Sequence, residues 1–248
     1  VAADISNEIF YRQYSSSTQK EIAELKHYVY VDNLTGGDTY LLFKSKVRSI
    51  NRNGSIIAIN IHDFKTINTI CGTSLGDIVL KRIWMILKDL NKPEDLVARV
   101  GADSYVVYTI DDPLEGHIYK QHEFVARLQD LSHELDIPSL IPYIGTAHYN
   151  PNDDVEIVYS RACIARNLLK NRPGVIGLTY TNEMGNNAKG MRSLEAAFDD
   201  ALADNRIELW LQPKFSPRTN TVVGAEALVR WRGKDSIIIP PNKFISLL

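Results

Sequence analysis

The 248-residue chain has only two cysteines, Cys71 and Cys163, and no Cys-x-x-Cys pair. A disulfide framework or a structural zinc site is therefore excluded, and two free thiols in a reducing compartment are expected. No apolar run approaches the ~18 residues needed to cross a bilayer, and the first residues lack the pattern of a signal peptide. We expect this stretch to be cytoplasmic, although an upstream region could anchor a longer parent protein.

An excess of charge of either sign is also missing. The 28 basic and 30 acidic side chains nearly cancel, and no Lys/Arg-rich run occurs, so DNA and RNA are not expected partners. With 44% hydrophobic and 23% charged residues, the composition is that of a globular protein with a core. The chain opens without methionine and stops inside an apolar pattern, which suggests a fragment of a longer protein.

Hydrophobic periodicity predicts alternating helices and strands. A helical lead-in is expected over residues 1–29, and Cys71 is expected in a loop. Predicted helices cover 38–52, about 75–90, 117–135 and 155–170, and predicted strands cover 55–61, 96–100, 104–110, 141–149 and 174–181. The pair 96–100 and 104–110 is separated by a connection of hairpin length. This order predicts an α/β sandwich with a central mixed sheet flanked by helices.

A second unit is expected after this set. Residues 181–190 are rich in Asn and Gly and lack periodicity, so they predict a linker, which we place at 182–192 between domains at 30–181 and 193–248. Beyond it the pattern predicts a helix, followed by strand-like runs at 207–213 and 221–231.

Five ordered motifs in the first domain resemble the GGDEF family of diguanylate cyclases. VDNLTG (31–36) is similar to the family's D-x-L-T-G entry motif, INIHDFKTIN (59–68) to its strand motif, and CGTSLGD (71–77) to its F-G-H-x-x-G-D. ARVGADSY (98–105) resembles the signature R-x-G-G-D-E-F, and YSRACIARNLLK (159–170) resembles the late helix that ends in A-x-x-x-x-K. The resemblance implies a nucleotide-cyclase-like fold over residues 30–181.

The resemblance also implies a damaged catalytic centre. In the family, divalent metals support attack of one GTP 3′-hydroxyl on the α-phosphate of another. The family's strand Asp ligand falls on Asn60, its signature acidic ligand on Asp103, and its catalytic Glu on Ser104, while Ala102 replaces a phosphate-facing Gly. Because Mg²⁺ relies on anionic oxygens, Asp103 is expected to be a weak metal ligand by itself. Residual cyclase activity would need an unusual arrangement around Asp103 and Asp63.

Nucleotide binding is a separate question. The family's guanine-reading pair falls on Asn68 and Asp77, and the resemblance adds Phe64, Lys65 and Lys170 to a nucleotide-binding set. GTP with Mg²⁺ is the expected ligand, with cyclic di-GMP as the other nucleotide candidate. The alternative is structural: Asn68 caps a helix and Asp77 supports the turn into the next one.

Two further positions favour ordinary surface roles. The family's R-x-x-D product-inhibition motif is represented by residues 92–95, in which Lys92 cannot give the planar bidentate contact of Arg. His62 stands where the family often has a second Asp, and no neighbouring His or Cys completes a metal site. We interpret the first as a charged loop and the second as a polar surface or pocket-rim residue.

The last part of the chain resembles the opening of an EAL domain, the cyclic di-GMP phosphodiesterase family. Gln212-Pro213, Glu226-Ala227-Leu228 and Arg230-Trp231 follow the family order. The resemblance makes Glu226 a ligand of the catalytic Mg²⁺ or Mn²⁺ and Arg230 a phosphate contact. It also implies the first βα elements of an incomplete TIM-like barrel, whose remaining ligands lie on later strands.

The leading hypothesis is a catalytically inactive regulatory GGDEF domain that binds GTP and sets the activity of an attached EAL phosphodiesterase. Its partners would be its own EAL domain and an upstream sensor region. The alternative is a purely structural domain, without a nucleotide ligand, that forms a homodimer through the lead-in helix.

Overall fold

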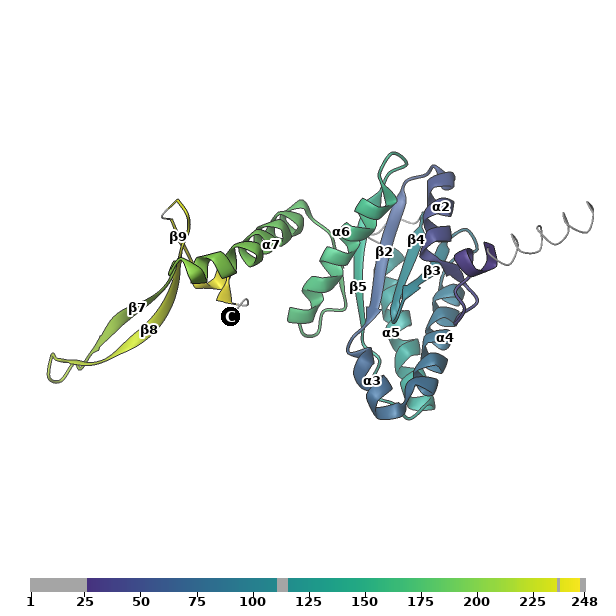
Figure 1. Ribbon diagram of the computed structural model, residues 1–248. Helices are drawn as coiled ribbons and strands as arrows, with labels where there is room; N and C mark the ends of the chain where they lie inside the picture. The colour runs from purple at the N-terminus through teal and green to yellow at the C-terminus, as the bar shows by residue number, and fades with distance from the viewer. Residues whose placement is uncertain (1–25, 111–115, 236, 246–248) are drawn as a thin grey trace, which may run out of the picture. The chain divides into compact units, whose positions relative to one another are not determined.

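The strands of residues 30–181 assemble into one sheet with helices on both faces, as Figure 1 shows. This computed structural model describes residues 26–110, 116–235 and 237–245. Two units divide between Thr181 and Asn182. The predicted α/β architecture with a mixed sheet is confirmed for the first unit. Of the predicted lead-in, only residues 26–29 are described, and they belong to a helical segment that ends at residue 30.

The sheet of the first unit has six strands in the order β1-β3-β4-β2-β5-β6. The strands are β1 (Asp38–Thr39), β2 (Gly54–Ile61), β3 (Leu96–Gly101), β4 (Ser104–Thr109), β5 (Pro142–Tyr149) and β6 (Gly177–Thr179). The helices are α2 (Tyr40–Ile50), α3 (Phe64–Cys71), α4 (Thr73–Leu90), α5 (Gly116–Glu134) and α6 (Val155–Asn167), followed by the short 3₁₀ helix η1 (Leu168–Asn171). The two edge strands pair parallel to their neighbours, and the four central strands pair antiparallel.

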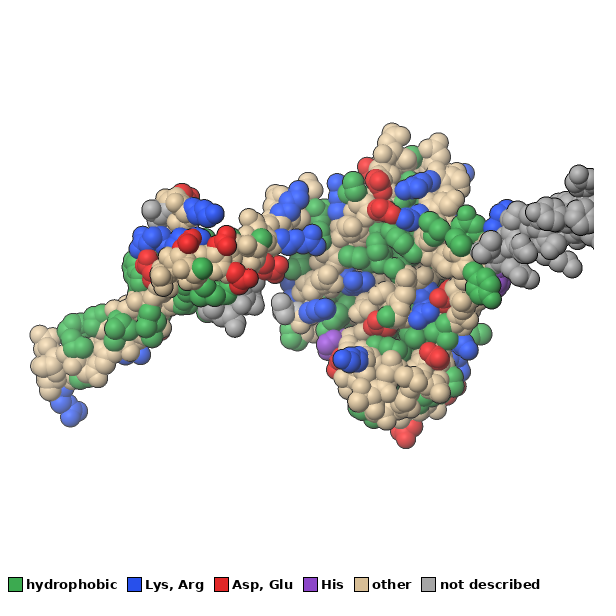
Figure 2. Space-filling model, in the orientation of Figure 1, with side chains coloured by type: hydrophobic (Ala, Val, Ile, Leu, Met, Phe, Trp, Pro, Cys, Tyr) green, Lys and Arg blue, Asp and Glu red, His purple; other side chains and the backbone are tan. Residues whose placement is uncertain are grey.

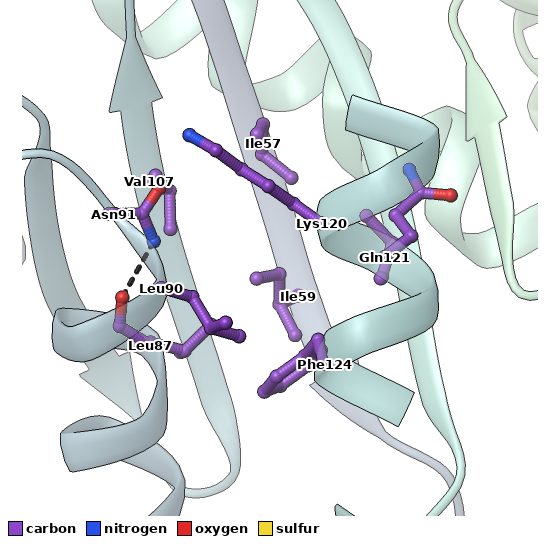
Figure 3. Close-up of a pocket in the computed structure, with 10 residues that line it drawn as sticks. Ile57, Ile59, Leu87, Leu90, Asn91, Val107, Lys120, Gln121 and Phe124 are labelled. Atoms are coloured by element: carbon purple, nitrogen blue, oxygen red, sulfur yellow. Dashed lines mark hydrogen bonds between the residues drawn. The ribbon is translucent and has the colours of Figure 1, made fainter. Parts of the chain in front are cut away.

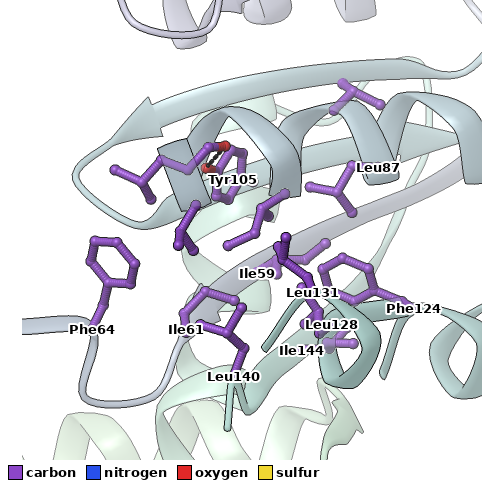
Figure 4. Close-up of a cluster of buried hydrophobic side chains, with 14 of the residues drawn as sticks. Ile59, Ile61, Phe64, Leu87, Tyr105, Phe124, Leu128, Leu131, Leu140 and Ile144 are labelled. Atoms are coloured by element: carbon purple, nitrogen blue, oxygen red, sulfur yellow. Dashed lines mark hydrogen bonds between the residues drawn. The ribbon is translucent and has the colours of Figure 1, made fainter. Parts of the chain in front are cut away.

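Strand alternation sorts the side chains of β2 between two cores. Ile57, Ile59 and Ile61 face α3, α4 and α5, where they pack with Phe64 and other apolar side chains (Figure 4). Alternate residues of the same strand, among them Ile56, face α2 and α6. Successive side chains of a strand point to opposite faces of the sheet. A strand with apolar residues at both odd and even positions must therefore be covered on both faces. This is why SIIAINI behaves as a central strand.

The chain between β2 and α4 is more helical than predicted. Cys71, expected in a loop, is the last residue of α3, and Gly72 with a φ of 85° separates α3 from α4. Phe64 and Ile67 are buried one helical turn apart, and this apolar contact holds an eight-residue helix on the core. The helical period was missed because the segment is so short.

The last predicted strand of the first unit is shorter than expected. Of residues 174–181, only Gly177–Thr179 pair as β6, at the edge of the sheet beside β5. Gly174 has a φ of 81°, a left-handed conformation that ends regular structure before the strand begins.

The second unit begins with a helix where a linker was predicted. Helix α7 spans Asn182–Ala203 without a break, so residues 182–192 are helical. Each Asn or Gly in a helix costs only about 1 kcal/mol or less relative to Ala, and no proline interrupts the segment. The helix packed through Phe198 and Ala201 therefore extends back through it.

The remainder of the second unit is a three-stranded antiparallel sheet, β7 (Ile207–Phe215), β8 (Val222–Arg232) and β9 (Ile238–Ile239), with a 3₁₀ turn η2 (Pro241–Lys243). No helix separates β7 from β8, as a βα unit would require, because their short connection only allows an antiparallel hairpin. Trp231 is the centre of its small core, with its ring 5.7 Å from Phe198 and 5.4 Å from Phe244.

The β7–β8 hairpin exposes apolar side chains. Leu209, Leu211 and Val223 are each about two-thirds exposed, and Figure 2 shows hydrophobic side chains gathered along this hairpin. On the same view, Lys/Arg and Asp/Glu side chains of the first unit are interspersed. Among the helices of the described ranges, none has the length and hydropathy that a bilayer crossing requires.

Candidate functional site

Asn60, Ser104 and Tyr143 form a row across three adjacent strands at the end of β2. Asn60 is the register partner of Ser104 on β4 and of Tyr143 on β5, so the three side chains share one face of the sheet. The Asn60 amide Nδ2 donates a hydrogen bond of 3.2 Å to Ser104 Oγ. Two positions where the resemblance requires acidic groups are thus joined by a neutral hydrogen bond.

The signature turn between β3 and β4 is held by Arg99. The backbone passes through φ values of 145° at Gly101 and 47° at Ala102, and a left-handed conformation costs a non-glycine residue roughly 1–2 kcal/mol. Arg99 Nε and Nη2 donate to the Ala102 carbonyl at 3.0 and 2.7 Å, which offsets that cost. Asp103 follows, half-buried, at the tip of the turn.

The remaining nitrogen of Arg99 ties this turn to the start of the domain. Arg99 Nη1 lies 3.2 and 3.0 Å from the two carboxylate oxygens of Asp32, which also accepts hydrogen bonds from the Thr35 backbone and hydroxyl. Burial by itself raises the pKa of Asp32, but the Thr35 hydrogen bonds and the Arg99 charge outweigh it and lower the pKa. Asp32 is therefore held as a carboxylate, so the guanidinium stays oriented toward Ala102.

Helices α3 and α4 bring the proposed base-reading residues to adjacent places. Asn68 lies inside α3 and packs against Gly76, where a Cβ would come within 1.9 Å of Asn68 Oδ1. Asp77, the next residue, is exposed on α4. The alternative roles are wrong in detail: Asn68 caps no helix, because Asp63 holds the N-cap position of α3, and Asp77 lies within α4 rather than in the turn before it.

The other members of the predicted nucleotide set differ in exposure. Phe64 is a core residue at 6% exposure, so only its backbone is available to a ligand. Lys65 is exposed on α3, and Lys170 is exposed on η1 rather than at the end of α6. Asp63 accepts a 2.8 Å hydrogen bond from the Thr66 hydroxyl, which makes it a local helix-start residue.

A cavity of about 390 Å³ opens beside this strand end. Its polar lining comes from His62, Tyr143, Lys170 and Arg172, and Gly174 forms part of its wall. The His62 and Tyr143 rings are in contact, with their centroids 5.0 Å apart. The sequence prediction of His62 as a pocket-rim residue agrees with this position.

The residues around the signature turn do not fit a divalent metal. Asn60 presents an amide that is already hydrogen-bonded, Ser104 presents a hydroxyl, and Asp103 supplies the one carboxylate at the turn itself. Over residues 26–110, 116–235 and 237–245, no cluster of three or more His, Cys, Asp or Glu side chains could hold a metal ion. Mg²⁺ is held in proteins by carboxylates together with phosphate and water oxygens, so this donor set is too poor in charge.

Residues 92–95 form a structural turn. Asp95 is 2% exposed, and its carboxylate accepts a 3.0 Å hydrogen bond from the Lys92 backbone and lies 3.5 Å from Lys120 Nζ. These contacts come from within the domain, in line with the interpretation of this stretch as a loop.

Lys120 also lines a second, mainly apolar cavity of about 40 Å³ between α4, α5 and the sheet (Figure 3). Ile57, Ile59 and Phe124 form much of its wall, and Asn91 donates to the Leu87 carbonyl at its rim. It is a packing gap of the core, with room for a few waters at most.

In the second unit, Glu226 and Arg230 lie on the same face of β8. Glu226 pairs in register with Gln212, and its carboxylate lies 3.5 Å from Lys214 Nζ. Arg230 is placed over the Trp210 ring at 5.9 Å. The hairpin therefore groups polar residues on one face, opposite the apolar face that carries Leu209 and Leu211.

Sequence reasoning missed several of these contacts. Tyr143 and Arg172 were not identified, because neither belongs to a recognised motif. The Asp32–Arg99 pair was not predicted. The available signal was that the two residues carry opposite charges and each lies in one of the motifs described above.

Comparison with known proteins identifies both parts of the chain. Residues 40–174, more than half of the chain, match the family described as "Diguanylate cyclase, GGDEF domain", and residues 195–248 match the EAL domain. "Signaling protein YkoW" of Bacillus subtilis is 25% identical over 248 residues, which covers 95% of this chain and 30% of that protein.

A second relative, "Cyclic di-GMP phosphodiesterase NbdA" of Pseudomonas aeruginosa, is 23% identical and covers 91% of this chain and 30% of that protein. The chain thus spans less than a third of the length of these two relatives. A solved structure of the coiled coil and GGDEF domain of DgcB from Caulobacter crescentus, in complex with c-di-GMP, has a TM-score of 0.60 at 14% identity. It covers 70% of this chain and 97% of that one, and it shows the likeness of fold. The chain belongs to the GGDEF family, and the start of an EAL domain follows its GGDEF domain.

Proposed function

We propose that the first unit is a catalytically inactive GGDEF domain that binds GTP as a regulatory ligand within a cyclic di-GMP signalling protein. The observation that carries this proposal is the Asn60–Ser104 hydrogen bond, which stands where the reaction needs carboxylates. Phosphoryl transfer in this family depends on positioning and on charge neutralisation by metals. Without those carboxylates the attacking hydroxyl has neither a metal nor a general base beside it.

The positions of Asn68 and Asp77 on α3 and α4 support ligand binding. Asn68 packs on Gly76 at the α3–α4 contact, and the exposed carboxylate of Asp77, the next residue, can accept hydrogen bonds from a guanine edge. In the whole protein, we propose that this domain sets the activity of the EAL domain, where Glu226 would bind Mg²⁺ or Mn²⁺ and Arg230 a substrate phosphate. The similarity to a phosphodiesterase supports that assignment.

The chain should make no cyclic di-GMP from GTP with Mg²⁺ or Mn²⁺, while calorimetry should detect GTP binding. Asp77→Asn should weaken that binding about tenfold, because a carboxylate–guanine hydrogen bond is charge-assisted. Asp130→Asn, which removes an exposed carboxylate from α5, is the matched control and should bind GTP like the unaltered chain. Detection of cyclic di-GMP would overturn the inactive assignment, and absence of GTP binding at millimolar concentration would overturn the ligand assignment.

One observation favours a second candidate, a purely structural domain. Asn68 Oδ1 is buried against Gly76 and has no hydrogen-bond partner among the described residues. If the role of Asn68 is packing, Asn68→Ala should change the free energy of unfolding, and calorimetric titration with GTP should show no binding to either the variant or the unaltered chain. Asn152→Ala, at an exposed loop position, is the control for an Asn lost from the surface.

A further inference from the structure

The cavity beside β2 concentrates positive charge where the metal ligands are missing. Lys170 and Arg172 supply two permanent cations, His62 an imidazole, and the lining contains no Asp or Glu. Among the described residues, none of these three side chains forms an ion pair or hydrogen bond. Its volume of about 390 Å³ lies within the range of small-molecule sites.

The cavity is also joined to the candidate nucleotide site. Tyr143 lines the cavity and is the register partner of Asn60 on β2. His62 directly follows β2 in the chain, and its imidazole ring contacts the Tyr143 ring. Tyr143 and His62 therefore connect the cavity to the strand end at Asn60.

The polar groups of the cavity suit a chain of phosphates. Arg172 offers a planar fork of donors that matches phosphate oxygens, Lys170 offers a compact charge, and His62 and Tyr143 each offer a hydrogen-bond donor. Lys170 and Arg172 both line the cavity, with one residue between them in the chain. Their combined charge can neutralise much of a triphosphate without a bound cation.

We propose that the residues at this strand end do not fit a divalent metal and that a nucleoside triphosphate binds here without one, with Lys170 and Arg172 supplying the counter-charge to its polyphosphate and His62 a hydrogen-bond donor. The proposal rests on the proposed function, that the domain binds a nucleotide as a ligand. It follows from a disagreement within the site: the donor set at Asn60, Asp103 and Ser104 does not fit Mg²⁺, whereas the neighbouring cavity carries the positive charge that Mg²⁺ would supply. Side-chain cations replace metal as the counter-charge.

Inorganic tripolyphosphate is the direct probe, titrated calorimetrically into the whole chain in the presence of EDTA. We expect binding in EDTA that is not strengthened by Mg²⁺, and weaker binding at high salt because the contacts are ionic. Lys170→Gln with Arg172→Gln should lower the affinity about tenfold or more, since two charge-assisted contacts are lost. Both side chains are exposed, so the variant should keep its melting temperature.

A matched control removes the same two charges elsewhere: Lys189→Gln with Arg192→Gln, both exposed on α7. It should bind tripolyphosphate like the unaltered chain. Equal weakening in both double variants would show diffuse electrostatic attraction and would overturn the cavity assignment.

A GTP titration run in parallel separates this inference from the proposed function. Binding of GTP that needs Mg²⁺ overturns the inference and leaves the regulatory ligand in place. If tripolyphosphate binds in EDTA and GTP binds no more tightly than tripolyphosphate, the polyphosphate site in the cavity is supported. Recognition of the guanine base by Asn68 and Asp77 is then overturned. No binding of either probe overturns both.

Discussion

At the scale of single residues, the loss of acidic character at the strand end leaves the fold undisturbed. Asn has the shape of Asp, and Ser104 keeps its place in the β2–β4 register, so the strands pair through the altered positions. Two carboxylates in this half-buried place would repel each other unless a cation lay between them. The amide–hydroxyl hydrogen bond removes that need, because both side chains are neutral.

Restoring the two acids should restore metal affinity. Asn60→Asp with Ser104→Glu would place three carboxylates around the turn, together with Asp103, and Mn²⁺ affinity should rise roughly tenfold or more because ligand charge sets the affinity of hard cations. Titration followed by the electron paramagnetic resonance of free Mn²⁺ measures this change.

The control for added charge is Asn53→Asp with Ser45→Glu, at exposed positions away from the turn. It should leave Mn²⁺ affinity unchanged. If the unaltered chain binds Mn²⁺ as tightly as the restored variant, the account of the missing metal is wrong.

At the scale of elements, one ion pair connects three segments that are far apart in the sequence. Asp32 belongs to the turn after the helical residues 26–30, Arg99 to β3, and Ala102 to the signature turn. The side chains of Asp32 and Arg99 are only 18% and 12% exposed, so solvent cannot easily replace their contacts. A displacement of the segment before β1 would therefore reach the signature turn through Arg99.

Asp32→Asn should destabilise the first unit at neutral pH by about 1–3 kcal/mol, because it leaves the guanidinium of Arg99 without a carboxylate partner. The native pKa of Asp32 is lowered from its ordinary value of 3.8, so its contribution is present above that pH and is lost as the pH falls through the lowered pKa. The difference between the two proteins should therefore shrink in strong acid.

Urea unfolding at pH 7 and at pH 3 or below measures this difference. Asp130→Asn removes an exposed acid that forms no ion pair with a described residue, and it should unfold like the unaltered chain at both pH values. A constant difference between the Asp32→Asn protein and the unaltered chain at all pH values would show that the Asp32 charge does not support the turn.

At the scale of the whole molecule, the two units have unequal cores. The first contains two apolar layers on opposite faces of its sheet, whereas the buried hydrophobic cluster of the second consists of Ala201, Trp231 and Phe244 among the described residues. Its hairpin leaves Leu209, Leu211 and other apolar side chains exposed. An exposed apolar face of this kind is a surface on which further packing can occur.

Ending the chain after Thr181 should leave the first unit folded and remove the contiguous apolar face of the β7–β8 hairpin. The shortened protein should bind the dye ANS several-fold less than the 248-residue chain, because ANS reports exposed apolar clusters. Circular dichroism should show that the α/β unit persists. Unchanged dye binding would place the apolar surface in the first unit and contradict this description.

The sequence alone determined the alternation of helices and strands, the central place of SIIAINI and the family. These features follow from local patterns: β-branched runs, helical stripes and motif order are readable without knowing what they touch. The same locality explains the errors. Helix α3 is too short for a helical period to be recognised in its sequence. Residues 182–192 are rich in Asn and Gly, which is typical of a linker, but they continue a helix whose later residues pack against the core of the second unit.

Only the tertiary structure decided what these residues do together. The Asn60–Ser104 bond, the Asp32–Arg99–Ala102 connection and the cavity of His62, Lys170 and Arg172 each join segments that are tens of residues apart. Sequence shows which charges are lost or kept, but pairing between distant strands sets which groups meet. The physical reason is that a site is made by register and packing, and these are long-range properties of the folded sheet.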